Sequence, residues 1–405
     1  MGGAETSLRE LMAAVRRAEP SWEVRLVLGE DGPLAGAARE IGVSTTVVPF
    51  PPRVARLGDA GKGKLTALSS LAGALPGAIP YARRLARHVR ELHPDIVHTN
   101  GFKMHLLGSW VCPPQARLIW HIHDYVSPRP MMSRLLRLEA RHSAAAIVNS
   151  KSVAADVQGI LPALPVRTLY NAVDLSRFAP EGPTLDLDAV AGLSRAGKGT
   201  VRVGLVGTFA RWKGHKVFLE ALSRLPAEAA IRGYIIGGPI YQTAGSQWSL
   251  EELRGEAERL GLAGKVGFTG FVDDAARAVR SLDIVVHAST GPEPFGMVVI
   301  EGMACGRAVI ASAAGGTCEL FVEGENAVGH PPGDAGTLAQ QILRLASDPA
   351  LRRRLGEYGR ATAEKTYDGR RLSRELLAIY QEALSRGKGV LYPATGSASE
   401  LCSRV

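Results

Sequence analysis

Two glutamates eight residues apart stand out in residues 291–334, GPEPFGMVVIEGMACGRAVIASAAGGTCELFVEGENAVGHPPGD. The pattern predicts a helix that begins near Glu293 and carries Glu301 two turns further on. At roughly 100° a residue, the two carboxylates would be about 80° apart around the helix axis and about 12 Å apart along it. We therefore expect them to hold two separate hydroxyl-bearing parts of one extended ligand, rather than to act as acid and base on one atom.

Glycines in the same stretch predict contacts with anions. The amides of a first helical turn, here around Gly296 and Met297, attract phosphate or sugar oxygens. Gly315 and Gly316, followed by Thr317, repeat this arrangement at a second turn. The alternative is a structural stretch, in which one glutamate caps a helix, the other faces solvent and the glycines allow close packing.

A second candidate is the loop in VGLVGTFARWKGHKVFLEAL, between a strand that ends at Gly207 and a helix that begins at about Gly214. The loop carries Arg211 and Lys213. Two cations at the carboxyl edge of a parallel strand are well placed to neutralise a diphosphate. A solvated basic loop is the alternative. The spacing excludes a nucleotide-triphosphate P-loop, because the motif Gly-x-x-x-x-Gly-Lys-Ser/Thr is absent.

A third candidate is WHIHDYVSPRP, in which His121, His123 and Asp124 end a predicted strand. Residues two apart share a face of a strand, so the two histidines could suggest a metal. No third ligand follows at a zinc-like spacing, and the pair Asp186-x-Asp188 lies in a predicted linker, so we expect no metal site. His123 is a better candidate for orienting a substrate, with a structural histidine as the alternative.

The strands and helices that position these residues can be predicted from short apolar runs with amphipathic stretches between them. The runs are WEVRLVLG, STTVVPF, PDIVHTN, RLIWHIHD, AAAIVNS and VRTLYN in the first half, then VRVGLVGTF, GYIIGG, KVGFTG, LDIVVHAS and RAVIAS. Apolar strands alternating with amphipathic helices predict an α/β protein, whose parallel sheets are covered on both faces. Ligands bind at the carboxyl ends of such strands, and two such edges could face each other across a cleft.

The length of 405 residues predicts two doubly wound, Rossmann-like domains rather than one core. We expect domains at 1–180 and 201–365, a linker rich in Gly, Pro and Ala at 181–200, a last helix at 366–384 and a poorly ordered tail at 385–405.

Charge and cysteine content narrow the class of protein. The net charge of +9 favours anionic partners such as nucleotides, phosphates, acidic lipids or nucleic acids. The four cysteines have neither paired nor metal-type spacing, which favours reduced thiols in a cytoplasm. No apolar run is long enough to span a membrane, and the first residues lack the pattern of a signal segment.

Together, these motifs resemble those of the retaining family-4 glycosyltransferases, the Glu-x7-Glu group of enzymes with a GT-B fold. The resemblance extends from Gly2 to about Leu384, and its specific part is the Glu–seven–Glu stretch with ACGRAVIAS and a glycine pair after it. LYNAVDLSRF resembles the end of the family's first domain. TYDGRRLSRELLAIYQEAL resembles its last helix, which crosses back to that domain.

The resemblance implies roles in binding the donor. Glu301 would hold the ribose hydroxyls of a nucleotide sugar, and Glu293 would hold hydroxyls of the sugar. Backbone amides would meet the sugar and the phosphates at Gly296, Met297 and Val298. In the cation loop, Arg211 and Lys213 would carry the diphosphate. One departure weakens this last assignment for Arg211: the family often has an arginine directly after the loop glycine, where this chain has Thr208.

The resemblance also implies roles at the first domain and the base. GGAE is the family's first strand-to-helix turn, so amides of Gly2 and Gly3 would face the donor phosphates and the acceptor. His123 would lie by the reacting sugar, with Asp124 on the acceptor side. Val272, in GFVDD, would border the base.

The resemblance therefore predicts a cytoplasmic, metal-independent, retaining glycosyltransferase without a bound cofactor. Its partners would be a nucleoside-diphosphate sugar and an acceptor hydroxyl on a glycan, a lipid or a small molecule, and not a nucleic acid. Two alternatives stay open: another GT-B enzyme, such as a nucleotide-sugar epimerase or a phosphorylase, and a two-lobed sugar-binding protein without chemistry.

Basic residues predict a further partner for the first domain. Residues 53–90 contain many arginines and lysines and a single acidic residue, Asp59, while Arg134, Arg137 and Arg141 recur at helical spacing. Each basic residue near an anionic membrane contributes about 1 kcal/mol to binding. We expect weak, salt-sensitive contact with the inner face of a membrane, with solvated helix faces as the alternative.

The opening glycines raise a structural question, because the strand that should precede them is not in the sequence. In a doubly wound sheet that strand would lie between WEVRLVLG and PDIVHTN, which would then be about 9.6 Å apart. We expect one of three outcomes: a strand upstream of Met1, a slot filled by GVLY at 389–392, or direct pairing of residues 24–28 with residues 95–99.

Overall fold

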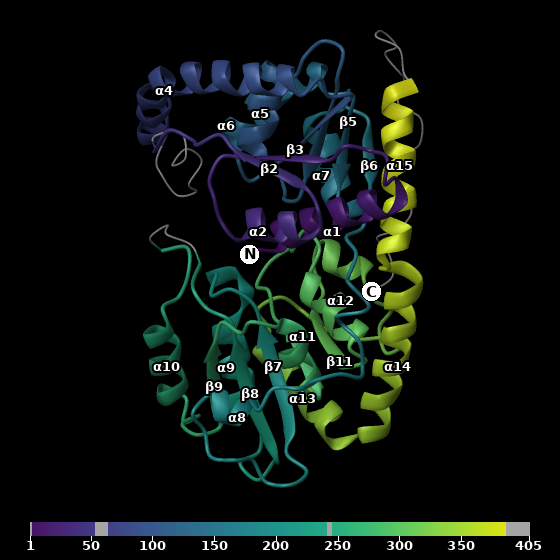
Figure 1. Cartoon of the computed structure of the whole chain (residues 1–405). Coiled ribbons are helices and arrows are strands. Elements are labelled where there is room, and N and C mark those ends of the chain that lie inside the picture. Colours follow the sequence, from purple (N-terminus) through teal and green to yellow (C-terminus); the bar gives the residue numbers. More distant parts are fainter. Residues whose placement is uncertain (1, 53–63, 241–244, 386–405) are drawn as a thin grey trace.

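All the predicted strands are present in the computed structural model, which describes residues 2–52, 64–240 and 245–385 and only the backbone of 64–75 (Figure 1). They form three parallel sheets. In the first domain these are the pair β1 (Arg25–Leu28) and β2 (Ser44–Val47), and a four-stranded sheet in the order β3 (Ile96–Asn100), β4 (Arg117–Ile122), β5 (Ala145–Val148), β6 (Val166–Thr168). The sheet of the second domain has the order β12 (Val328–His330), β11 (Ala308–Ser312), β10 (Ile284–His287), β7 (Val201–Val206), β8 (Ile231–Ile236), β9 (Val266–Gly270). Only the short β12 was not predicted.

Helices cover the sheets on both faces. Those of the first domain are α1 (Gly3–Ala18), α2 (Pro33–Glu40), α4 (Lys64–Glu91), α5 (Phe102–Val111), α6 (Pro130–Glu139), η1 (Ala140–His142) and α7 (Lys151–Ile160). Those that follow are α8 (Leu187–Val190), η2 (Arg211–Lys213), α9 (His215–Ser223), α10 (Leu250–Arg259), α11 (Ala275–Arg280), α12 (Met297–Ala304), η3 (Gly316–Glu319), α13 (Ala335–Ser347), α14 (Pro349–Thr366) and α15 (Gly369–Ser385). No helix among the described residues is long and apolar enough to cross a membrane.

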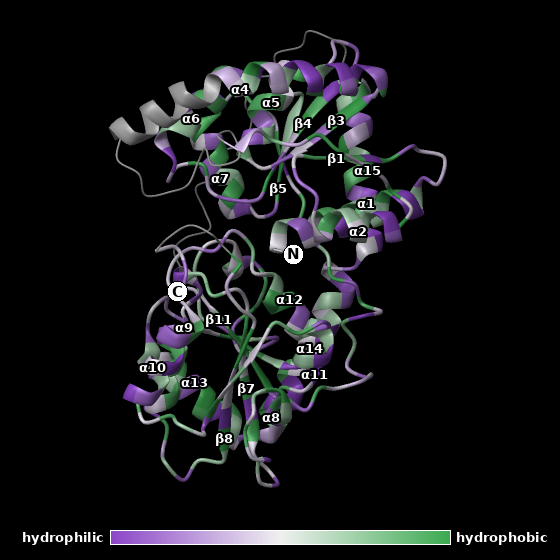
Figure 2. Cartoon of the chain, turned by 60° about the vertical axis from the view of Figure 1, so that its left-hand side comes forward, coloured by the Kyte–Doolittle hydropathy of each residue, from purple (hydrophilic) through white to green (hydrophobic). Residues whose placement is uncertain are grey.

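The second sheet shows why its strands are apolar throughout. Ile284 and Val286 of β10 belong to the core on one face of the sheet, with Phe218 of α9. Val285, between them, belongs to the core on the other face, with Val299 of α12. Successive side chains of a strand point to opposite faces, so both must be apolar when both faces are covered. Figure 2 shows these strands as hydrophobic and the outer helices as mixed.

The chain crosses between the domains twice. The two crossings lie side by side, because the amide of Val173 in the first donates to the carbonyl of Tyr367 in the second at 2.9 Å. After this point α15 packs on the first domain, where Leu372 and Leu376 contact a core that includes Leu11 of α1 (Figure 1). The last helix therefore returns to the first domain, next to α1.

The segment 181–200, for which composition predicts a linker, is packed against the second domain. Asp188 is buried, and its carboxylate accepts hydrogen bonds from Arg232 and Tyr234, each at 2.7 Å. Asp186 caps α8 by accepting from the amide of Ala189. Asp188 is thus buried within the second domain, while Asp186 is exposed and caps a helix.

Direct pairing of residues 24–28 with residues 95–99, one of the three expected outcomes, does not occur. β1 pairs with β2 and β3 pairs with β4, and residues 24–28 are not paired with residues 95–99, so the sheet has not closed. A cavity of about 1470 Å³ is lined by both β1 and β3. Residues 389–392 lie outside the described part of the chain.

Candidate functional site

Glu293 lies in a loop and not on a helix, so the predicted helical geometry of the two glutamates is wrong. α12 begins four residues later, after Gly296, whose φ of +105° is left-handed and interrupts a helix. Pro294 also disfavours helical backbone at Glu293. The loop is held by Gly315 and Gly316, because the amide of Gly316 donates to the carbonyl of Glu293 at 2.8 Å.

The carboxylate of Glu293 is buried and has three partners. The ammonium of Lys213 donates to Oε1 at 2.5 Å, and Nε2 of His287 contacts Oε2 at 2.5 Å. The hydroxyl of Ser289 also donates to Oε2. Since the amide of Ser312 donates to Nδ1 of His287, the proton of this imidazole is placed on Nε2, facing Glu293.

This environment keeps Glu293 ionised. Burial by itself would raise the pKa of the carboxyl group, but the charge of Lys213 and the contact with His287 hold the pKa well below its ordinary value. The result is a fixed, buried carboxylate that can accept hydrogen bonds from ligand hydroxyls.

His287 and Ser289 are site residues that the sequence analysis missed. His287 is the last residue of the buried strand β10, and Ser289 lies two residues further on, so both side chains lie at the end of this strand. His121 and His123 were selected because they lie two residues apart at the end of an apolar run, and LDIVVHAS shows the same pattern at His287 and Ser289.

The two cations of the predicted loop diverge. Lys213 reaches Glu293, whereas the guanidinium of Arg211 stacks 3.7 Å from the ring centroid of Trp248 and lies 3.5 Å from Glu252. The amide of Thr290 donates to the carbonyl of Trp212 at 2.8 Å, which ties the cation loop to the end of β10. Only Lys213 therefore belongs to the cluster around Glu293.

The start of α12 offers backbone donors and a second carboxylate. No described residue accepts a hydrogen bond from the amides of Met297 and Val298. Glu301, one turn further on, is partly buried, and its carboxylate has no hydrogen-bonding or ionic partner among the described residues. Burial raises the pKa of Glu301 to about 7, although the charges of Arg177 and Lys213 oppose this. Lys213 thus acts electrostatically on both glutamates.

The glycine pair 315–316 supports the Glu293 loop, and this support uses the amide of Gly316. A Cβ on Gly316 would lie 2.1 Å from the carbonyl oxygen of Pro294, so the backbones meet there. The hydroxyl of Thr317 donates to the carbonyl of Phe295. These groups are used within the protein, and the anion contact predicted at this turn is wrong for Gly316.

The first domain brings the start of α1 to this site. A Cβ on Gly3 would lie 3.9 Å from Cγ of Met297, so α1 and α12 begin opposite each other across the domain border (Figure 1). Gly2 is the N-cap of α1, and its amide donates to Glu5 at 2.7 Å. The hydroxyl of Tyr125 donates to the carbonyl of Glu293 at 3.4 Å, a second link between the domains.

His123 and Asp124 differ in their freedom to meet a ligand. Nε2 of His123 contacts Oδ1 of Asn100 at 2.8 Å, and its ring lies 3.9 Å from that of His121, as the shared strand face predicts. Burial lowers the pKa of His123 to about 4, so its imidazole is neutral at pH 7. The carboxylate of Asp124 is occupied by Arg129, at 2.6 Å, and by the amide of Tyr125.

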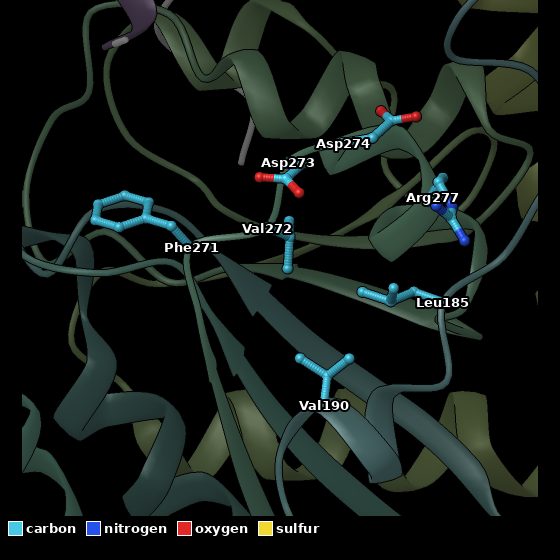
Figure 3. A pocket seen from close by; sticks show the side chains of 7 residues that line it. All are labelled: Leu185, Val190, Phe271, Val272, Asp273, Asp274 and Arg277. Carbon is cyan, nitrogen blue, oxygen red and sulfur yellow. The ribbon is translucent and has the colours of Figure 1, made fainter.

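Val272 borders a separate small pocket of about 190 Å³. Its side chain points towards Leu185 and Val190, away from the carboxylates of Asp273 and Asp274 (Figure 3). The side chain of Val272 therefore belongs to this small pocket.

No group of side chains among the described residues has the composition and spacing of a metal site. Arg177, Lys213 and the amides at the start of α12 bring positive charge to the site.

Both halves of the chain match known families. Residues 1–177 match the family described as Glycosyltransferase Family 4, and residues 194–362 match Glycosyl transferases group 1. The phosphatidyl-myo-inositol mannosyltransferase of Mycolicibacterium smegmatis is 31% identical over 232 residues, which are 56% of this chain and 54% of that protein. The chain thus spans about half the length of this relative. The lipopolysaccharide core biosynthesis mannosyltransferase LpcC of Rhizobium leguminosarum is 26% identical over 297 residues, 69% of this chain and 82% of the relative.

Solved structures share the fold over nearly the whole chain. HepE of Anabaena, in complex with UDP-glucose, has a TM-score of 0.76 and 22% sequence identity. The match covers 94% of this chain and 96% of the HepE chain. Sucrose-phosphate synthase of Thermosynechococcus elongatus has a TM-score of 0.72 at 22% identity, with 94% of each chain covered. At this identity the likeness concerns the fold, which is GT-B.

Proposed function

Because the chain belongs to the family-4 glycosyltransferases of GT-B fold, we propose that it transfers a sugar from a nucleoside diphosphate to an acceptor hydroxyl. The observation that supports this most directly is the buried ion pair of Glu293 and Lys213, which lies beside the open amides of α12 and near the start of α1. A carboxylate, an ammonium group and a helix N-terminus within one site match the hydroxyls and the diphosphate of a nucleotide sugar.

Each group has a proposed role in holding the donor. Glu293 accepts hydrogen bonds from hydroxyls of the sugar, and Glu301 accepts those of the ribose. Lys213 and the amides of Met297 and Val298 bind the diphosphate. Arg211 contributes less than Lys213, because its guanidinium is stacked on Trp248.

The proposed chemistry retains the configuration of the anomeric carbon. The bond from this carbon to the diphosphate oxygen breaks, and the acceptor oxygen bonds to the same face. The acceptor proton passes to the departing phosphate oxygen. Lys213 stabilises the charge that develops there, an electrostatic role that needs no metal ion. His123, neutral at pH 7, can hydrogen-bond the sugar or the acceptor.

The test is transfer from a panel of UDP-, GDP-, ADP- and dTDP-sugars, ranked first by thermal shift. A bound donor at a hundred times its Kd stabilises the protein by about 2.7 kcal/mol. The expected product is an α-linked sugar from an α-linked donor, read by NMR, with rates unchanged after treatment with EDTA. Conversion of the donor without acceptor would identify an epimerase, and inverted product would contradict the proposed mechanism.

The role of Glu301 can be tested by pH. Its pKa of about 7 implies that the carboxylate, the better acceptor for ribose hydroxyls, is lost as the pH falls below 7. Nucleotide affinity, measured by calorimetry, is expected to weaken from pH 8 to pH 6. In Glu301→Gln the affinity should be lower and nearly independent of pH over this range. An unchanged pH profile in the variant would exclude this role.

We further propose that the acceptor is presented at an anionic membrane. Helices α4 and α6 both pack against α5, on which Trp110 is 58% exposed. The two flanking helices expose Arg83, Arg84, Arg87, Arg90, Arg134, Arg137 and Leu138. Arginines around an exposed tryptophan suit a lipid interface. Phosphatidyl-myo-inositol mannosyltransferase, by its name, acts on a lipid headgroup.

Sedimentation with anionic and neutral vesicles tests this surface. Binding is expected only to anionic vesicles, with loss at high salt and weakening in Trp110→Ser. Arg353→Ser, an exposed arginine on α14 of the other domain, is the matched control. Equal binding by both variants, or none at low salt, would overturn the membrane proposal and leave the transfer reaction untouched.

A further inference from the structure

Three neighbouring strands of the first domain, β3, β4 and β5, lead into polar residues at the same edge of their sheet. Asn100 is the last residue of β3 and lies opposite His121 of β4. His123 comes directly after β4, and Asn149 comes directly after β5. Because β4 pairs with β3 on one side and with β5 on the other, His123 has an asparagine on each neighbouring strand.

Asn100 fixes the position of the proton on the ring of His123. Its Oδ1 lies 2.8 Å from Nε2 of His123. An amide oxygen can only accept a hydrogen bond, so Nε2 carries the proton and donates it. The imidazole is neutral and has this single N–H, because burial lowers the pKa of His123 to about 4. Nδ1 therefore keeps its lone pair and can only accept a hydrogen bond.

Asn149 holds the backbone of the same histidine. Its side chain is buried, and its Nδ2 donates to the carbonyl of His123 at 3.2 Å. Its Oδ1 is also buried and has no hydrogen-bond partner in the described part of the chain. An unsatisfied buried oxygen is costly, so this asparagine serves chiefly the contact with His123. The ring of His121 lies a further 3.9 Å from that of His123, so ring and backbone are both held before a substrate arrives.

The titratable groups around His123 leave its imidazole neutral. Asp124, the next residue, is paired with Arg129 at 2.6 Å. Burial lowers the pKa values of the neighbouring histidines of β3, α5 and β4 below 6.5, and these are His98, His105 and His121. Asn100 thus acts on His123 through a hydrogen bond between two neutral groups, and a charge placed at position 100 would act on the imidazole directly.

We propose that Asn100 is a positioning residue of the transfer reaction, which fixes the tautomer of His123 so that Nδ1 accepts a hydrogen bond from a hydroxyl of the bound sugar or of the acceptor. Asn100 acts through His123 and not on the substrate. The inference rests on the proposed transfer function, but the tautomer is a property of the protein and can be measured without a substrate.

Asn100→Asp tests the need for a neutral acceptor. The variant keeps the shape and the oxygen of the side chain, and its negative charge raises the pKa of His123. Imidazolium has no lone pair, so kcat at saturating donor, divided by that of the unaltered protein, should fall between about pH 7 and pH 5. Asn326→Asp is the matched control, because this buried asparagine of the second domain also accepts through Oδ1, from the amide of Val322. Its ratio should not change with pH.

Asn100→Leu removes the acceptor oxygen and leaves both tautomers of His123 accessible. We expect kcat to fall roughly tenfold at every pH from 6 to 8. A higher KM for the acceptor would assign the hydroxyl to the acceptor, and a higher KM for the donor would assign it to the sugar. If this variant does not fold, Asn100→Asp decides.

Nitrogen-15 NMR spectra of the protein without substrate show the tautomer, with the signals of His123 assigned by their absence in His123→Gln. The proton is expected on Nε2 in the unaltered protein and on either nitrogen in Asn100→Leu. A proton on Nδ1 in the unaltered protein would overturn the proposal, as would a pH profile of Asn100→Asp equal to that of the unaltered protein. Absence of transfer from every donor would count against the transfer function, whereas the spectra decide on the tautomer in either case.

Discussion

At the scale of residues, the site depends on a buried ion pair whose members hold each other. Glu293 has a side chain that is 8% exposed, and Lys213 one that is 22% exposed. Removing one member of such a pair leaves an uncompensated charge, at about 3–5 kcal/mol. His287 and Ser289 keep Glu293 in position, so the carboxylate is oriented before a ligand arrives.

Lys213→Ala is expected to lower turnover by a factor of roughly 100 to 1000, equal to about 3–4 kcal/mol of transition-state stabilisation. The loss should appear in kcat rather than in the KM of the acceptor. Lys265→Ala, which removes an exposed lysine of the same domain, is the control and should leave turnover unchanged. Normal turnover in Lys213→Ala would remove this residue from the mechanism.

Buried histidines predict how stability depends on pH. Burial lowers the pKa of His98 to about 3 and the pKa values of His123 and His215 to about 4, below the ordinary value of 6.5. The unfolded chain therefore binds more protons between pH 6.5 and pH 4, and the free energy of unfolding falls as the pH drops through this window. Each histidine contributes up to about 1.4 kcal/mol per pH unit there.

His215→Phe isolates one of these contributions from those of the carboxylates. Neither ring nitrogen of His215 has a hydrogen-bond partner in the part of the chain that the structure describes, and the ring already packs against Phe209. Urea unfolding at pH 7 and pH 5 should show a smaller loss of stability in the variant than in the unaltered protein. An equal loss in both would show that His215 does not contribute.

At the scale of elements, α12 and the loop before it set the geometry of the site. Gly296 adopts a left-handed backbone and separates Glu293 from the helix, while Gly316 lets η3 contact the loop closely. The same loop that orients Glu293 therefore leaves the first amides of α12 open. A small shift of this loop would move the carboxylate and the amides relative to each other.

Gly316→Ala tests this packing. Its Cβ would meet backbone of Pro294, so we expect a loss of about 1–3 kcal/mol in stability, with lower activity. Gly159→Ala, on α7, has open space at its Cβ and should be neutral or stabilise by about 0.5–1 kcal/mol. Chemical unfolding and turnover check both. Equal behaviour of the two variants would contradict the assignment.

At the scale of the whole molecule, the domains are joined by a helix cap that crosses the border. The carboxylate of Glu319, in η3, accepts from the amides of Lys151 and Ser152 at the start of α7, each at 2.8 Å. It also accepts from the hydroxyl of Tyr170 at 2.9 Å. A carboxylate at a helix N-terminus is favoured by the free amides and by the helix dipole.

Glu319→Ala is expected to weaken the contact between the domains by about 1 kcal/mol, the usual effect of losing a cap. Hydrogen exchange at the amides of Lys151 and Ser152 should become faster, while β7 and β10 keep their protection. Glu325→Ala, which changes an exposed carboxylate of the same domain, is the control. Unchanged exchange at α7 would show that the cap does not hold the domains together.

The sequence by itself determined the class of fold and the strands, because the features that specify them are local. Apolar runs such as VRVGLVGTF and LDIVVHAS must be buried on both faces, and the stretches between them have helical periodicity. The motif residues Lys213, Glu293 and Glu301 were also predicted from the sequence.

Tertiary structure alone decided which of these residues meet. Arg211 and Lys213 are two positions apart, yet Trp248 and Glu252 draw one away while Glu293 holds the other. His287 contacts a neighbouring strand, and Glu319 contacts a helix of the other domain. Such contacts depend on the packing of segments far apart in the chain, and a local pattern carries no record of which distant side chain will lie within hydrogen-bonding distance.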